Sequence, residues 1–175
     1  KDNTIMDSIS SIDIAKNKCA ELGGTEFDKL IYTKEAIQIC KRAIEKEPKN
    51  YKNYLYLGRL YDSNENYKEA YKNYNIAAIN GNARAQHNLG VLYENGSGAQ
   101  EDNNKALEWY LKAAGQNFYL SYNNIAELYV NEEWVNYNPK KGFEWAKKAA
   151  PLSSSGTYVL ANFYYLGLGT QVNIP

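Results

Sequence analysis

The side chains best suited to chemistry are few and lie far apart in the chain. Among 175 residues there is one histidine, His87, and there are two cysteines, Cys19 and Cys40. A two-histidine metal site is therefore excluded, and His87 has no neighbouring cysteine with which to form a nucleophilic dyad. These residues indicate neither a metal centre nor a cysteine-based active site.

The acidic pairs and the glycine-rich segment have simpler explanations than catalysis. Glu101-Asp102 and Glu132-Glu133 lie where loops or helix starts are expected, where solvation and helix-terminal charge account for carboxylates. Gly96-Ser97-Gly98 lies between two expected helices, whereas a nucleotide-binding glycine motif follows a strand. We therefore predict no enzymatic activity, no cofactor and no metal.

Composition and charge bound the class of partner. Hydrophobic residues make up 44% of the chain, including 17 tyrosines, which is enough for one continuous core. Twenty basic residues balance twenty acidic ones, so the net field does not favour nucleic acid. No apolar run reaches the roughly 18 residues that span a bilayer, and we expect no membrane insertion in this chain.

Two interleaved series of similar segments organise the sequence. In one, alanine-rich segments open on small residues 34, 36 and 36 residues apart, at Ala36, Ala70, Ala106 and Gly142. In the other, segments with a Gly or Ala near the middle end on tyrosines 32, 36 and 35 residues apart, at Tyr61, Tyr93, Tyr129 and Tyr164. Both series have helical periodicity, with small residues where two helices approach closely. The pattern predicts antiparallel helical hairpins.

Helix-start signals agree with these hairpins. Asn66, Asp102 and Asn138 each precede the small residue of the second helix by four positions, where a side-chain oxygen can cap free backbone N–H groups. Pro139 suits a first helical position, and Asn66 with Glu69 predicts a capping box.

One hairpin cannot bury its own apolar stripe, so neighbouring hairpins must stack. We predict one all-α repeat domain, 1–175, with about nine helices, in which an apolar stripe over 5–22 forms the first helix. The segment 167–173 parallels 96–102, so the chain stops where the next helix should begin, which predicts a longer parent protein or a final helix that is not seen. The approximate units are 5–47, 51–80, 83–115, 119–151 and an incomplete 154–175.

The third unit resembles a SEL-one-like repeat of the tetratricopeptide-like superfamily. The matching residues are Ala85 to Gly98, Asp102, Lys105-Ala106, Trp109-Tyr110 and Lys112-Ala113-Ala114. The fourth unit departs from the pattern, since Ala126 replaces a glycine and 131–137 lacks Gly-x-Gly, and the second unit is closer to a plain tetratricopeptide repeat. The resemblance implies a right-handed α-solenoid whose first helices line a concave, partner-binding groove.

On that geometry, four positions on each first helix point into the groove, at offsets −6, −3, +1 and +4 from the small-residue column. An ordinary solvated surface is the alternative. The lysine and asparagine array of carboxylate-clamp tetratricopeptide domains is absent from these columns. The predicted groove residues are Lys52, Leu55, Arg59, Asp62, Arg84, His87, Val91, Glu94, Leu120, Asn123, Glu127, Val130, Ser155, Tyr158, Asn162 and Tyr165.

The cysteines occupy matching columns of the first hairpin. Cys19 and Cys40 are 21 residues apart, close to the 20 that separate Gly90 from Tyr110, so the two side chains should face each other. Two interpretations remain open. A disulfide would favour a periplasmic or secreted protein, and two buried thiols a cytoplasmic one.

The predicted function is a non-catalytic scaffold that binds another protein or a peptide through the groove. A bacterial secreted or periplasmic adaptor, or a toxin-immunity protein, is a narrower form of this hypothesis that the resemblance implies. The alternative is a structural or regulatory segment of a larger protein whose activity lies outside this chain.

Overall fold

The computed structural model describes residues 19, 34–134 and 136–170. The predicted first helix, 5–22, lies outside these residues except for Cys19. Within the described part the structure is all-helical and has no strand. Its elements are α2 (Lys34–Lys46), α3 (Tyr51–Asp62), α4 (Tyr67–Ile79), α5 (Ala83–Glu94), α6 (Asn103–Ala114), α7 (Leu120–Leu128), α8 (Pro139–Ala149), the short 3-10 helix η2 (Ala150–Leu152) and α9 (Ser154–Leu166).

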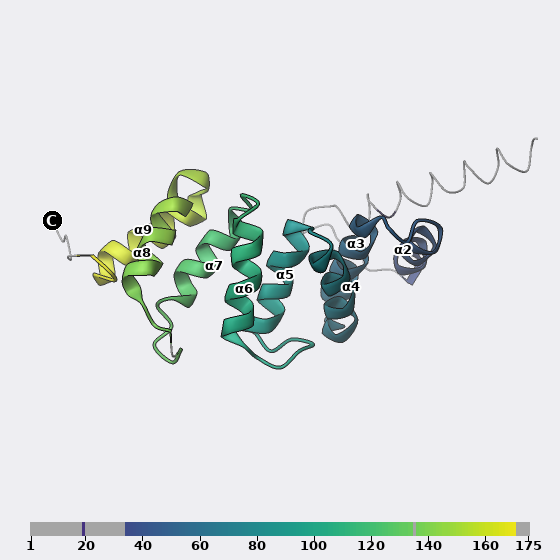
Figure 1. Cartoon of the computed structure of the whole chain (residues 1–175), viewed down its shortest axis with the longest axis horizontal. Helices are drawn as coiled ribbons and strands as arrows, with labels where there is room; N and C mark the ends of the chain where they lie inside the picture. Colours follow the sequence, from purple (N-terminus) through teal and green to yellow (C-terminus); the bar gives the residue numbers. More distant parts are fainter. Residues whose placement is uncertain (1–18, 20–33, 135, 171–175) are drawn as a thin grey trace, which may run out of the picture.

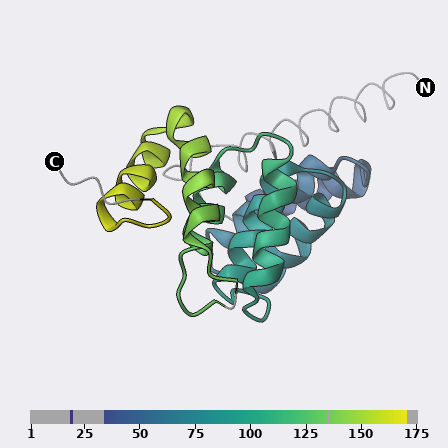
Figure 2. The same ribbon diagram turned by 60° about the vertical axis from the view of Figure 1, so that its left-hand side comes forward.

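The helices form an α-solenoid. Figure 1 shows them in chain order along the long axis, and each α-helix packs against the next one in sequence. Figure 2 shows the same row from a second direction. We call α3, α5, α7 and α9 the A helices, and α2, α4, α6 and α8 the B helices. None of the described helices has both the length and the apolar character needed to cross a membrane.

The predicted helix caps are confirmed. The Asp102 carboxylate accepts from the backbone N–H groups of Asn104 and Lys105, at 3.1 and 3.0 Å. Asn138 caps α8, with Pro139 in its first turn. The capping box at α4 is only half formed. Asn66 accepts from the Glu69 N–H at 3.4 Å, but its own N–H donates to a backbone carbonyl at the end of α3.

Close helix approach at glycine is also confirmed. A methyl group on Gly58 would lie 2.5 Å from a ring carbon of Tyr74, and one on Gly90 would lie 2.6 Å from a ring carbon of Tyr110. Both tyrosine rings are fully buried. The corresponding residue of α9, Ala161, is exposed.

Cys40 of α2 pairs with Cys19, which lies outside the described helices. The Sγ atoms of Cys19 and Cys40 are 2.12 Å apart and the Cα atoms 4.9 Å apart. Both residues are fully buried. Of the two interpretations that the sequence leaves open, the structure has the disulfide.

The loops after the A helices dock on the preceding B helix. Gly98 has a positive φ of 72°, and a side chain there would collide with the backbone carbonyl of Tyr67 at the start of α4. Gly169, with a φ of 70°, makes the same approach to Pro139 at the start of α8. The parallel between 96–102 and 167–173 is therefore confirmed over the residues that the structure describes.

Candidate protein-binding groove

Two pockets that share one lining residue, Arg84, lie among the A helices. The inner pocket, of about 170 Å³, is lined by Arg59, Arg84, His87, Asn88, Phe118 and Leu120. The outer pocket, of about 340 Å³, is lined by Lys52, Leu55, Tyr56, Asn82 and Arg84. Because Arg84 lines both, we treat them as one feature, the A-helix groove. Its walls come from α3, α5 and the segment that leads into α7.

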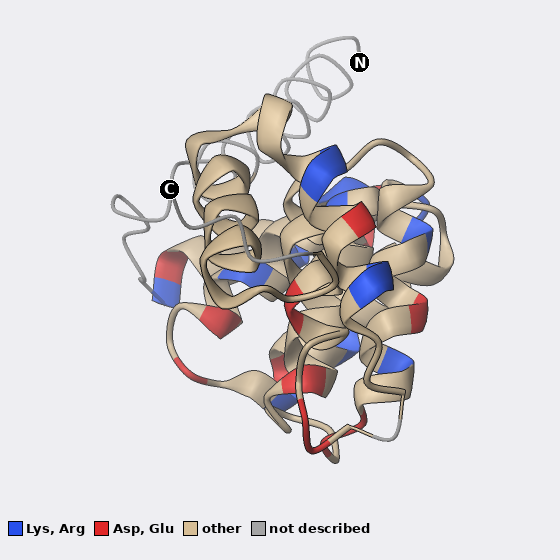
Figure 3. Ribbon diagram, turned by 90° about the vertical axis from the view of Figure 1, so that its left-hand side faces the viewer, with Lys and Arg blue, Asp and Glu red and all other residues tan. Residues whose placement is uncertain are grey.

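The charge of the groove is one-sided, although the molecule is neutral. Lys52, Arg59 and Arg84 line it, and no acidic side chain of the described residues does. By contrast, acidic and basic segments are interspersed over the end of the molecule seen in Figure 3. The groove is therefore a local basic site on a chain with no net charge.

The two arginines differ in how firmly they are held. Arg59 is only 4% exposed, and burial, followed by the charge of Arg84, lowers the pKa of Arg59. The nearby Asp62 carboxylate acts in the opposite direction with a smaller effect. Arg84 is exposed, and its guanidinium carbon lies 6.0 Å from the centre of the Phe118 ring. Arg59 thus supplies a fixed inner charge and Arg84 a more accessible outer one.

His87 is neutral near pH 7. Burial, with a smaller contribution from the charge of Arg84, lowers the pKa of His87 to about 4. Its Nδ1 lies 3.0 Å from Oγ of Ser121, and its ring packs 5.3 Å from that of Phe118, centre to centre. Ser121 is fully buried, so substrate has no access to this hydroxyl. The pair joins α5 to α7 and is a structural contact.

A similar bond joins the next two A helices. The side-chain amide of Asn123 donates to Oγ of Ser155 at 3.0 Å. Among the described residues, no group of three His, Cys, Asp or Glu side chains is placed to hold a metal ion. The His87–Ser121 and Asn123–Ser155 contacts thus link neighbouring A helices of the solenoid.

The structure brings together six of the sequence-predicted groove residues and uses others elsewhere. Asp62 and Glu94 accept hydrogen bonds from the hydroxyls of Tyr74 and Tyr110, at 2.9 and 2.5 Å. Burial, and then the nearby carboxylate charge, raises the pKa of both tyrosines, which therefore stay neutral donors. The six that line the groove are Lys52, Leu55, Arg59, Arg84, His87 and Leu120.

The remaining predicted positions lie outside the A-helix groove. Val91 and Val130 pack against core clusters. Glu127 has an exposed side chain, but neighbouring protein atoms partly desolvate its carboxylate; this desolvation, followed by the charge of Glu94, raises the pKa of Glu127. On α9, Asn162 is half-buried, whereas Tyr158 and Tyr165 are 67% and 77% exposed. No observation brings the α9 positions to the groove.

The offsets missed four lining residues: Tyr56, Asn82, Asn88 and Phe118. Tyr56 and Asn88 lie on the A helices but outside the four chosen columns. Asn82 and Phe118 precede the helices altogether. An aromatic residue at 118, between two units and near no core column, was the available signal.

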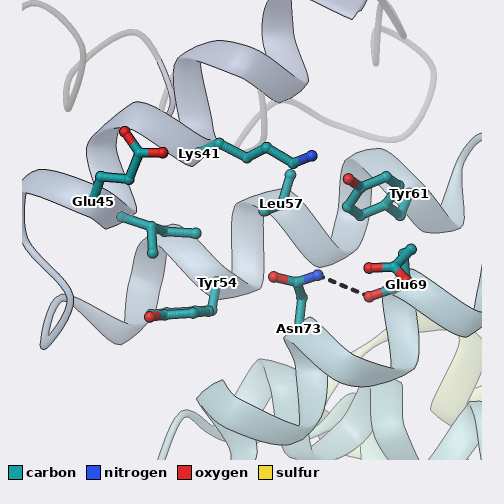
Figure 4. Close-up of a pocket in the computed structure, with 8 residues that line it drawn as sticks. Lys41, Glu45, Tyr54, Leu57, Tyr61, Glu69 and Asn73 are labelled. Atoms are coloured by element: carbon teal, nitrogen blue, oxygen red, sulfur yellow. Dashed lines mark hydrogen bonds between the residues drawn. The ribbon is translucent and has the colours of Figure 1, made fainter.

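A separate hollow lies between the B helices α2 and α4. It has a volume of about 290 Å³, and Lys41, Glu45, Leu57 and Tyr61 are among its lining residues. Figure 4 shows Lys41 lying over Leu57, and the Asn73 amide donates to the backbone carbonyl of Glu69 at 2.8 Å. Because both signs of charge surround an apolar floor, this hollow favours no particular ligand charge.

The solenoid and its repeat pattern define the class of protein. The Sel1 repeat matches residues 83–118, 120–152 and 154–175, more than half of the chain. A tetratricopeptide repeat matches residues 39–72. The chain therefore belongs to the Sel1 repeat family. Proteins of this repeat class generally mediate protein–protein interactions and are generally non-catalytic.

Two solved bacterial structures are similar to this chain. One is c5321, a protective antigen present in uropathogenic Escherichia coli strains, which displays an SLR fold; it has 28% identity and a TM-score of 0.70, and the match covers 79% of this chain. The other is a Sel1 repeat protein from Oxalobacter formigenes, with 26% identity and a TM-score of 0.69 over 94% of this chain. The matches span 30% and 64% of those two proteins. No curated protein matches the chain.

Proposed function

We propose that this chain is a non-catalytic scaffold that binds a protein or peptide partner through the A-helix groove. One observation carries the proposal: neighbouring A helices form two pockets that share Arg84, and three basic residues, Lys52, Arg59 and Arg84, line them together with apolar side chains. Solenoids of stacked helical hairpins generally use such extended surfaces to bind other proteins.

The disulfide and the bacterial neighbours support a narrower role. Disulfides persist in oxidising compartments, so Cys19–Cys40 favours a periplasmic or secreted protein. Both structural neighbours come from bacteria. We propose an extracytoplasmic bacterial adaptor, and a toxin-immunity protein is one form that such an adaptor takes.

The test compares two surfaces of the same molecule. Arg84→Glu with Leu120→Asp reverses charge and apolar character in the groove, whereas Lys140→Glu with Leu111→Asp makes the same changes on B helices. Leu120 and Leu111 are each 40% exposed, so neither change disturbs the core. Arg59 is avoided because a glutamate there would be buried.

Each variant is used to capture partners from the organism that encodes the chain, and captured proteins are then tested again as purified pairs. We expect the groove variant to lose the partners that the native chain and the B-helix variant both retain. Equal binding by all three proteins would contradict the groove as the binding surface.

A second candidate is that the chain is one segment of a larger protein. The observation that favours it is that both structural neighbours extend well beyond the matched region. In that case the groove would hold another part of the same protein. The full reading frame, followed by binding measurements between the separate parts, distinguishes the two.

A further inference from the structure

We propose, on the basis of the protein-binding role above, that the inner pocket recognises the side-chain carboxylate of an Asp or Glu within an extended segment of the partner. In this arrangement Arg59 and Arg84 hold the carboxylate, and an adjacent apolar side chain of the partner packs on Phe118 and Leu120.

The first support is charge complementarity. Three cationic side chains line the A-helix groove, and among the described residues no acid lines it with them. The imidazole of His87 is neutral near pH 7 and adds no charge. A guanidinium presents a planar set of N–H donors that matches a carboxylate in two-point contact. An anionic group entering the inner pocket also separates two arginines that repel each other.

The second support is the contrast with cations elsewhere on the surface. The ammonium group of Lys112 lies 3.9 Å from the centre of the Trp109 ring on the same helix, and that of Lys148 lies 4.2 Å from the centre of the Trp145 ring on its own helix. These lysines are engaged within the molecule. The groove arginines also have neighbours, since Arg59 lies near Asp62 and the guanidinium carbon of Arg84 lies 6.0 Å from the centre of the Phe118 ring. The difference is that these two cations come from different helices and line the same hollow.

The third support is size. A volume of about 170 Å³ is well below the several hundred Å³ typical of small-molecule sites, and it suits a single side chain. Arg84 also lines the larger outer pocket, with Lys52, Leu55 and Tyr56. A chain that places one carboxylate in the inner pocket therefore has room to continue, which favours an internal acidic residue over a chain terminus.

The experiment selects peptides from a random library displayed on phage, with the native chain as bait, and compares their sequences with those selected by Arg84→Gln. Arg84 is exposed, so the substitution removes the charge without opening the core. Lys140→Gln on α8 is the matched control. We expect the native chain and the control to enrich peptides with Asp or Glu at one fixed position beside an apolar residue, and Arg84→Gln to show a weaker preference, because only Arg59 then remains in the inner pocket.

The selected consensus peptide is then synthesised with its acidic residue intact or changed to the amide, and with a free or an amidated C-terminus. We expect a loss of affinity of roughly tenfold or more for the amide side chain, on the scale of a charge-assisted hydrogen bond. In Arg84→Gln the same change should cost less than in the native chain, because Arg59 alone then holds the carboxylate. Amidating the terminus should change nothing.

The outcomes separate the two levels of the proposal. If no peptide is enriched, peptide binding itself is contradicted. If peptides bind and the groove variant Arg84→Glu with Leu120→Asp abolishes binding, but no acidic position emerges, the groove stands and the carboxylate assignment is wrong. Loss of affinity on amidating the terminus alone would replace the internal carboxylate by a terminal one and also overturn the assignment.

Discussion

The neighbouring hairpins α5–α6 and α7–α8 close the same interface in different ways. In α5–α6, Gly90 leaves space for the ring of Tyr110, which is fully buried. The hydroxyl at the far end of the ring donates to Glu94 and accepts from Asn124, so its polar tip is satisfied.

In α7–α8 the corresponding positions hold Ala126, Ala146 and Val130. Both alanines are fully buried, and the two helices meet through small side chains. With no tyrosine hydroxyl to satisfy, no acid is required four residues after the small position, and Val130 packs there instead. The comparison shows that these three positions act as a set, because a buried hydroxyl needs an acceptor.

The loops of the two hairpins also differ, because one docks on the preceding B helix through its backbone and the other through a side chain. After α5, backbone at Gly98 rests on the start of α4. After α7 the Gly-x-Gly is missing, and Trp134 takes over the docking. Its ring is 6% exposed and packs against Tyr129, and its N–H donates to the Asn104 side chain at the start of α6, at 3.3 Å.

The largest effect is expected where one side chain replaces a backbone contact. Trp134→Ala should lower the free energy of unfolding by about 3–5 kcal/mol, since a large buried ring is removed. Tyr137→Ala, in the same loop and 41% exposed, is the control and should cost less than about 1 kcal/mol. Urea unfolding measures both, and similar losses would show that Trp134 does not anchor the loop.

A slightly smaller effect is expected in the backbone-docked loop. Gly98→Ala should cost on the order of 3 kcal/mol, because a left-handed residue acquires a side chain that meets the Tyr67 carbonyl. Gly96→Ala shares the positive φ but meets its neighbour at 3.3 Å, and should cost about 1 kcal/mol. Thermal or urea unfolding of the two variants checks this difference, and equal costs would mean that conformation alone, without docking, explains Gly98.

The hydrogen-bonded arrangement around the Tyr110 hydroxyl in α5–α6 can be converted into the apolar arrangement of α7–α8. Tyr110→Phe should cost about 1–2 kcal/mol, because Glu94 and Asn124 each lose a partner. Adding Glu94→Leu makes α5–α6 resemble α7–α8 and should restore part of that stability. A double-mutant cycle in urea measures the coupling, and strictly additive losses would contradict the idea that these positions act together.

The smallest expected effect is on the pH dependence of stability, because the link between A helices at His87 titrates and the one at Asn123 does not. The pKa of His87 is about 4 in the folded chain against 6.5 for an ordinary histidine, so the unfolded chain takes up the proton first. Stability that is present above pH 6.5 is therefore lost as the pH falls towards 4.

His87→Asn replaces the histidine by the residue type that links the next two A helices at Asn123, and a side-chain amide does not titrate. Between pH 7 and pH 5 the native chain should lose about 1 kcal/mol more than this variant, a figure discounted for partial exposure. The raised pKa values of Asp62 and Glu127 act in the opposite direction, but they are present in both proteins. Parallel unfolding at several pH values gives the difference, and identical profiles would show that His87 is not the responsible group.

Much of the fold could be predicted because the same residue types recur at the same contact positions in successive repeats. The glycine columns, the caps at Asp102 and Asn138 and the pairing of Cys19 with Cys40 follow from spacing along single helices and hairpins. The single-domain division of the chain stays a prediction. The half-formed capping box shows the limit, because the N–H of Asn66 found a backbone acceptor at the end of α3.

The groove could be predicted only in part, because it depends on how far neighbouring units overlap. A helical offset states which face a residue occupies, and Arg59 and Arg84 lie together in the inner pocket. It does not state whether the next unit covers that face, which is why Asn123 is buried against α9, where it donates to Ser155. Trp134 could not be predicted in this way, because it lies in the loop between α7 and α8, where helical spacing does not state what a side chain packs against.

The Cys19–Cys40 bond also determines how the molecule would respond to being stretched. It links two residues 21 positions apart in the sequence, and no such bond joins one described hairpin to the next. Under tension the bond keeps these two residues together, whereas the described hairpins are held to one another by noncovalent contacts. Reduction would remove this covalent limit on extension and leave the contacts between the described hairpins unchanged.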